Sequence, residues 1–158
     1  MKRTVKIFVW ITFAIYCIVL FKLLFLDMRV RFTSEGISAH LAISNFIPFK
    51  TIFNYIEKAA AGKINSSTAV VNIVGNLVAF LPLGCYLPCL FKRLRRFWLT
   101  IPLILCLILA VEILQPVLCV GVLDVDDIIL NISGAIIGFG IINIPMIKCL
   151  LKRIYIYT

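Results

Sequence analysis

Residues 64–91 contain no charged side chain over 28 consecutive positions, and three further apolar runs of comparable length occur in this chain of 158 residues. A helix needs roughly 20 apolar residues to cross the ~30 Å hydrocarbon core of a bilayer. The sequence is 63% hydrophobic with a mean hydropathy of +1.10, and a soluble domain of this size cannot bury so much apolar surface. The sequence therefore predicts an integral membrane protein.

The gaps between charged residues locate the membrane-spanning helices. The predicted fold class is an all-α integral membrane protein, a four-transmembrane-helix bundle that forms a single domain over residues 1–158. Between the first two spans, Asn45–Phe49 leads into an amphipathic stretch that is too short and too charged to cross. Residues 45–61 are therefore predicted to form an additional short interfacial or re-entrant helix. The predicted spans cover about residues 5–26, 69–90, 97–120 and 128–147.

Basic residues gather on one side of this topology. The N-terminus, the 91–96 loop and the C-terminal segment carry ten of the 16 Lys and Arg residues, whereas the first loop carries five and the loop at Asp124 carries none. The positive-inside rule then predicts a multi-pass protein of the cell membrane with both termini in the cytoplasm. This anchoring pattern accounts for the net charge of +9, so nucleic acid is not an expected partner.

Four of the seven carboxylates lie in or against the predicted spans, where acidic groups are costly and typical of functional sites. Asp124, Asp126 and Asp127 precede the fourth span, and Glu112 lies inside the third, ~12 Å from its outer end. Insertion at that depth costs up to roughly 3 kcal/mol, so we interpret Glu112 as a pocket residue that is either protonated or hydrogen-bonded to Asn76. Asp126 or Asp127 alternatively caps the fourth helix, although a cap does not need three carboxylates.

Amides and glycines accompany these carboxylates. Gly75 lies between two asparagines on one face of the second span and would permit close backbone approach, while Gly134 and Gly138 form a G-x-x-x-G strip suited to helix packing. Each amide alternatively serves as interhelical hydrogen-bond glue. The predicted pocket faces the extracytoplasmic side and consists of Glu112, Asp124, Asp126, Asp127, Asn131, Gln115, Asn72, Asn76 and Asn45.

Neither thiols nor imidazole indicate a metal site. The six cysteines all lie in apolar runs without a C-x-x-C pair, and the single histidine, His40, is expected to be a loop residue. The sequence identifies no catalytic residue, since it contains no His base, G-x-S-x-G elbow or Cys–His pair.

Four ordered motifs stand out along the chain: Asn45–Phe49, Asn72–Asn76 with Phe80–Gly84, Glu112–Gln115, and Asp124–Gly134 with Gly138. Together they resemble the motifs of the VanZ-like membrane protein family. That family is named for a component associated with teicoplanin resistance in glycopeptide-resistant bacteria. The resemblance implies a membrane protein that affects the response of the cell envelope to glycopeptide antibiotics. One departure is the stretch 118–122, which lacks the basic residue found in some members.

Three functions follow from an acidic pocket of this kind. In the first, it binds a cationic ligand such as a glycopeptide, or a cell-wall precursor, without catalysis and without a cofactor. The alternative is a metal-dependent membrane enzyme that acts on a lipid-linked cell-wall intermediate, with a divalent cation held by the carboxylates. Ion transport through Glu112 is a third, although four spans without an internal repeat would require a homo-oligomer to enclose a path. The lipid bilayer is a predicted partner in every case.

Overall fold

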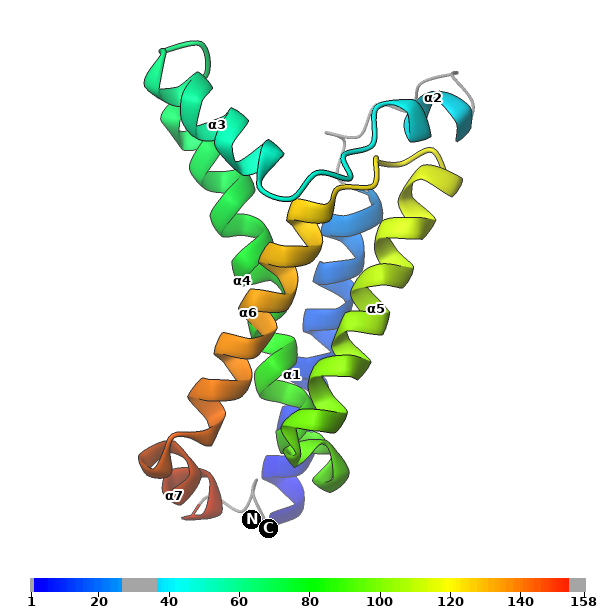
Figure 1. Cartoon of the computed structure of the whole chain (residues 1–158). Helices are drawn as coiled ribbons and strands as arrows, with labels where there is room; N and C mark the ends of the chain where they lie inside the picture. The colour runs from blue at the N-terminus through cyan, green and yellow to red at the C-terminus, as the bar shows by residue number, and fades with distance from the viewer. Residues whose placement is uncertain (1, 27–36, 154–158) are drawn as a thin grey trace.

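The computed structural model describes residues 2–26 and 37–153 (Figure 1). Four of its helices are long and apolar enough to cross a membrane. This result confirms the predicted all-α membrane fold. The four helices are α1 (Lys2–Phe21), continued by a π-helical turn η1 (Lys22–Leu26), α4 (Ser66–Leu90), α5 (Phe97–Val117) and α6 (Val125–Asn143).

Shorter helices occupy the two ends of the bundle. α2 (Ile37–Ala42) and α3 (Lys50–Ala60) lie at one end together with the α5–α6 connection (Figure 1). The 3₁₀ turn η2 (Lys92–Arg95), the beginning of α1 and α7 (Pro145–Arg153) lie at the other. α3 falls within the segment predicted as a short amphipathic helix, whereas α2 and α7 were not anticipated.

Several span boundaries differ from the expected ones by three or four residues, among them the start of α4 at Ser66 and the end of α6 at Asn143. Two further differences lie beside the aspartate motif. α5 ends at Val117 rather than at residue 120, because the chain turns sharply at Cys119, which has a left-handed backbone with φ 55°. α6 begins at Val125 rather than at residue 128, so that Asp126 and Asp127 lie in its first turn. Carboxylates favour this position because the first N–H groups of a helix lack backbone partners.

The central contact of the bundle joins α4 to α6, which run in the same direction (Figure 1). A Cβ atom added to Gly134 or Gly138 would overlap carbonyl oxygens of α4, and one added to Gly84 would overlap the backbone of α6. Small residues allow two membrane helices to approach this closely. The predicted glycine strip therefore packs against α4. At Gly75, by contrast, no atom of the described residues lies within 4 Å of an added Cβ, so none of them makes the close backbone approach expected there.

α1 packs on the outside of a core contributed by the other three spans. A hydroxyl bond ties it to α4, since Tyr16 donates to the carbonyl of Ala79 at 2.8 Å. Phe13 and Leu20 also pack against the core, while the remaining α1 surface is mostly exposed apolar side chains. Such a surface suits contact with lipid. The buried core consists of Phe80, Leu83, Leu87, Ile104, Ile108 and Ala135.

Candidate functional site: a buried carboxylate network

The segment before α3 is joined to the loop before α6 through Asn45. Its backbone N–H donates to the carbonyl of Leu123 at 2.9 Å, and its carbonyl accepts from the N–H of Val125 at 3.0 Å. The Asn45 side-chain amide also donates to Asp124 Oδ1 at 2.9 Å. These bonds form a short parallel bridge between segments about 80 residues apart. The bridge holds the first loop against the aspartate motif. This agrees with the predicted topology, in which the two segments lie at the same end of the bundle.

Asp126 caps the N-terminus of α3. Its side chain is completely buried, and Oδ2 accepts the N–H groups of Thr51 at 2.7 Å and Ile52 at 3.1 Å. Oδ1 accepts the N–H of Phe49, which adopts a left-handed backbone with φ 65°. The first N–H groups of a helix have no partner within the helix, and they carry the positive end of its dipole. Asp126, which is distant from α3 in sequence, therefore accepts the unpaired N–H groups of α3 and places a negative charge at the positive end of its dipole.

Asp124, rather than Asp126 or Asp127, is the N-cap of α6. Its Oδ1 accepts the N–H of Asp126 at 2.8 Å, and Oδ2 accepts the hydroxyl of Thr51 at 2.6 Å. The expectation that Asp126 or Asp127 fills this role is therefore wrong. An N-cap has to stand one residue before the helix, and α6 begins earlier than the sequence suggested.

Glu112 and Asp127 complete the network from α5 and from the first turn of α6. Glu112 is only 2% exposed, and its Oε2 accepts the N–H of Asp124 at 3.2 Å. Asn76 of α4 donates its amide to Asp127 Oδ1, so the expected Glu112–Asn76 bond is replaced by two others. Each of these carboxylates accepts one hydrogen bond from the described residues, whereas Asp124 and Asp126 each accept three.

Three predicted pocket residues make no hydrogen bond to the carboxylates. Asn72 donates to the carbonyl of Thr68 in its own helix at 2.7 Å, and Gln115 donates to the carbonyl of Leu24 in η1 at 3.1 Å. Asn131 lies on α6, one turn after Asp127, and is 2% exposed. Its Oδ1 is the one buried side-chain nitrogen or oxygen atom that has no hydrogen-bond partner in the described part of the chain. The network thus includes six of the nine predicted residues.

Residues that the sequence analysis did not select also hold the two loops together. His40 lies in α2 rather than in a loop, is buried, and its Nδ1 donates to the carbonyl of Gly121 at 2.8 Å. Ser44 accepts the N–H of Leu123 at 3.2 Å, and Thr51 bonds Asp124 as described above. A lone histidine or hydroxyl beside an apolar run carries no distinctive sequence signal, and only the fold shows what it contacts.

The arrangement of the carboxylates does not favour the alternative of a metal-dependent enzyme. Within residues 2–26 and 37–153, no group of three or more His, Cys, Asp or Glu side chains is placed to hold one ion. Asp124 and Asp126 direct their oxygens at N–H, amide and hydroxyl groups of the protein.

Beside the network, a pocket of about 190 Å³ on α3 is lined by Thr51, Asn54, Tyr55 and Lys58.

The fold and the network define a class: a four-span helical membrane protein whose loops at one end are fastened by buried carboxylates. The chain belongs to the VanZ/LLP1 family, whose profile matches residues 13–147, and the resemblance carried by the motifs is thereby confirmed. It is similar to Protein VanZ of Enterococcus faecium, with 29% identity over 114 residues that cover 68% of this chain and 69% of the relative. No solved structure matches the chain.

Proposed function

We propose that this protein lowers the sensitivity of the cell envelope to glycopeptide antibiotics of the teicoplanin type, and that it does so by binding rather than by catalysis. Membership of the VanZ/LLP1 family supports this proposal, because the VanZ-like family takes its name from a component associated with teicoplanin resistance. The binding step rests on a difference in hydrogen bonding within the network. Asp124 and Asp126 each accept three hydrogen bonds from the described residues, whereas Glu112 and Asp127 each accept one.

Glu112 and Asp127 are the carboxylates that we assign to ligand binding. Asp124 and Asp126 use both oxygens to hold backbone, amide and hydroxyl groups of the protein. Glu112 and Asp127 each retain an oxygen that accepts no bond from the described residues. Carboxylates in a site of low dielectric attract a cationic group strongly. Amines, which glycopeptides carry, are ligands of this chemistry.

The proposed orientation assigns the end of the bundle that carries this site to the extracytoplasmic side of the membrane. The N-terminal basic groups lie in the first turns of α1, those of residues 91–96 lie in or directly after η2, and the C-terminal ones lie in α7. All three groups are at the end of the bundle opposite the network (Figure 1). The positive-inside rule assigns that end to the cytoplasm. The carboxylates would then lie at the extracytoplasmic end, where a glycopeptide or a cell-wall precursor is accessible.

Drug susceptibility of a sensitive Gram-positive host tests the proposal. The host expresses the wild-type chain, Glu112→Gln or Asp127→Asn, with membrane levels matched by immunoblot. We expect the wild type to raise the teicoplanin concentration that inhibits growth, and both variants to lose the effect. Glu57→Gln is the matched control, because Glu57 is an exposed carboxylate of α3 at the same end of the bundle.

Two results would contradict the proposal. If the wild type leaves teicoplanin sensitivity unchanged, the function does not apply to this chain. If Glu112→Gln and Asp127→Asn keep the full effect, the carboxylates do not carry it. Size-exclusion profiles of the detergent-solubilised variants distinguish lost binding from lost folding.

A further inference from the structure

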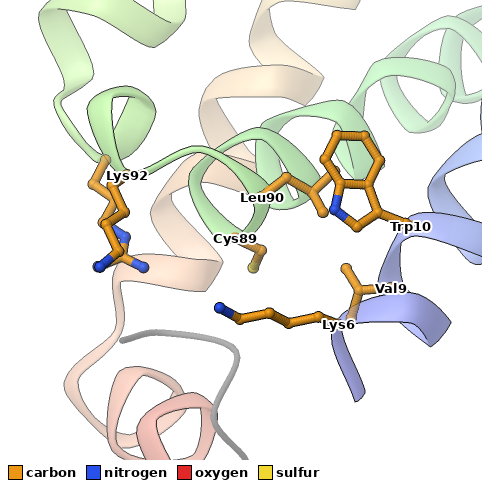
Figure 2. Close-up of a pocket in the computed structure, with 7 residues that line it drawn as sticks. Lys6, Val9, Trp10, Cys89, Leu90 and Lys92 are labelled. Atoms are coloured by element: carbon orange, nitrogen blue, oxygen red, sulfur yellow. The ribbon is translucent and has the colours of Figure 1, made fainter. Parts of the chain in front are cut away.

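A basic pocket of about 190 Å³ lies at the end of the bundle opposite the carboxylate network (Figure 2). It is formed by α1 and by the end of α4 with η2. Lys6 comes from α1, and Lys92 and Arg95 come from η2. The Lys6 amine extends past Cys89 toward the side on which Lys92 lies (Figure 2). Among the described residues, the lining contains three cations and no acidic side chain, so the pocket favours an anion.

The opposite wall of the pocket is apolar, and its Trp10 packs against two other rings. Trp10 packs edge-to-face against Phe91 with ring centroids 5.6 Å apart, and against Phe13 with centroids 6.0 Å apart. Val9 and Leu90 continue this wall. A small soluble anion would use the cations but not the wall. The combination instead suits a ligand with an anionic head and an apolar body.

The pocket lies at the start of α1 and the end of α4, the level at which two membrane-spanning helices are expected to meet the interface. Tryptophan is enriched at this level because its ring is apolar and its N–H is polar. Ile7, Phe8 and Ile11 of α1 are exposed apolar side chains next to the pocket in sequence, so its apolar wall adjoins the surface that faces lipid. A volume of 190 Å³ corresponds to roughly six waters at ~30 Å³ each, enough for a phosphate with its ester oxygens.

We propose that this pocket binds the phosphate of an anionic phospholipid, with Lys6 and Lys92 on the phosphate and Trp10 against the upper part of an acyl chain. Basic pockets between membrane helices recognise anionic headgroups in this way. Membrane orientation alone requires cations in the loop but no pocket. Arg93 and Arg96 are exposed in the same loop and are not part of the lining. This inference does not depend on the proposed function.

The two tryptophans of the chain provide the test. The full-length protein is reconstituted in phosphatidylcholine vesicles that contain increasing fractions of brominated phosphatidylglycerol, which quenches nearby tryptophan. Trp98→Phe leaves Trp10 as the reporter of the pocket. Trp10→Phe leaves Trp98, which is 81% exposed at the start of α5, as the reporter of ordinary surrounding lipid.

We expect quenching of Trp10 to saturate at a low fraction of brominated phosphatidylglycerol, whereas quenching of Trp98 should follow the bulk fraction. In the Trp98→Phe background, Lys6→Gln with Lys92→Gln should reduce the preference of Trp10 for phosphatidylglycerol over phosphatidylcholine by about fivefold for each lysine, which corresponds to about 1 kcal/mol per cation. The control pair Arg93→Gln with Arg96→Gln removes the same charge from the same end of the bundle and should change the preference less than about twofold.

Three outcomes would overturn the proposal. The first is equal quenching of Trp10 by brominated phosphatidylglycerol and brominated phosphatidylcholine. The second is an equal loss of preference in the lysine pair and the arginine pair, which would indicate general surface charge. The third is reversal of the Trp10 quenching by millimolar glycerol 3-phosphate, which would identify a soluble phosphate as the ligand. Unchanged helical circular dichroism shows that each variant is folded.

Discussion

Asp126 should contribute strongly to the stability of this fold, because it holds the start of α3 against α6. In Asp126→Ala, the N–H groups of Phe49, Thr51 and Ile52 lose their acceptor at once. A buried donor left without a partner costs about 1–3 kcal/mol, and loss of a helix cap alone costs about 0.5–2 kcal/mol.

The structure narrows this range. The three bonds are only partly buried, so water replaces some of the lost acceptors. The cost of each unpaired donor then lies at the lower end of the range, about 1 kcal/mol. Three donors at about 1 kcal/mol each then give a destabilisation of about 3 kcal/mol. Asp126→Asn keeps one acceptor oxygen but turns an NH₂ group toward a backbone donor, so about half of this loss is expected.

Unfolding in mixed detergent micelles measures the free energy, and hydrogen exchange at Thr51 and Ile52 reports the cap itself. Asp126→Ala should lower the free energy of unfolding and accelerate exchange of both amides, whereas Glu57→Ala on the exposed face of the same helix should change neither by more than about 0.5 kcal/mol. The reasoning is refuted if Asp126→Ala unfolds like the wild type, or if it is destabilised while both amides keep their protection.

Further predictions concern helix packing, the network and the topology. Gly134→Ala should cost about 1–3 kcal/mol in the same unfolding assay because the new methyl meets the α4 backbone, whereas Gly140→Ala has open space around it and should be neutral. In the teicoplanin assay, Asn76→Ala should lose the effect because Asn76 donates to a network carboxylate, and Asn72→Ala should keep it because Asn72 bonds only its own helix. In a cysteine-free background, a cysteine at the exposed residue Ala61 should react with a membrane-impermeant maleimide in intact cells. Reaction only after permeabilisation would reverse the proposed orientation.

The fold could be predicted from the sequence because the lengths of its apolar runs leave few alternatives. A run such as 64–91 can satisfy its backbone polar groups in lipid only as a helix. The charge pattern then placed Asn45 and the aspartates at one end of the bundle, and the structure joins them by hydrogen bonds. The G-x-x-x-G spacing likewise indicated a close helix contact, which α4 and α6 form.

The partner of each carboxylate could not be predicted. Asp126 bonds residues 74–77 positions away, and these bonds depend on the path of the first loop, including the left-handed turn at Phe49. Local capping rules relate a carboxylate to the helix that follows it, so they suggested α6 rather than α3. His40 was set aside for a similar reason, since its partner Gly121 lies 81 positions away.

The network contains carboxylates that hold the fold together and carboxylates that we assign to ligand binding, and mutational data on the two kinds have to be interpreted differently. Loss of resistance in an Asp126 variant would be ambiguous, because the same side chain holds α3 and its removal disturbs the whole loop. Asp127 accepts a single bond from Asn76, and Glu112 a single bond from the Asp124 N–H, so Asp127→Asn and Glu112→Gln remove charge with little change in shape. A functional defect in these two variants, at unchanged stability, would therefore reflect the chemistry of the site. The same defect accompanied by a loss of about 3 kcal/mol would instead reflect the cap, as expected for Asp126→Ala.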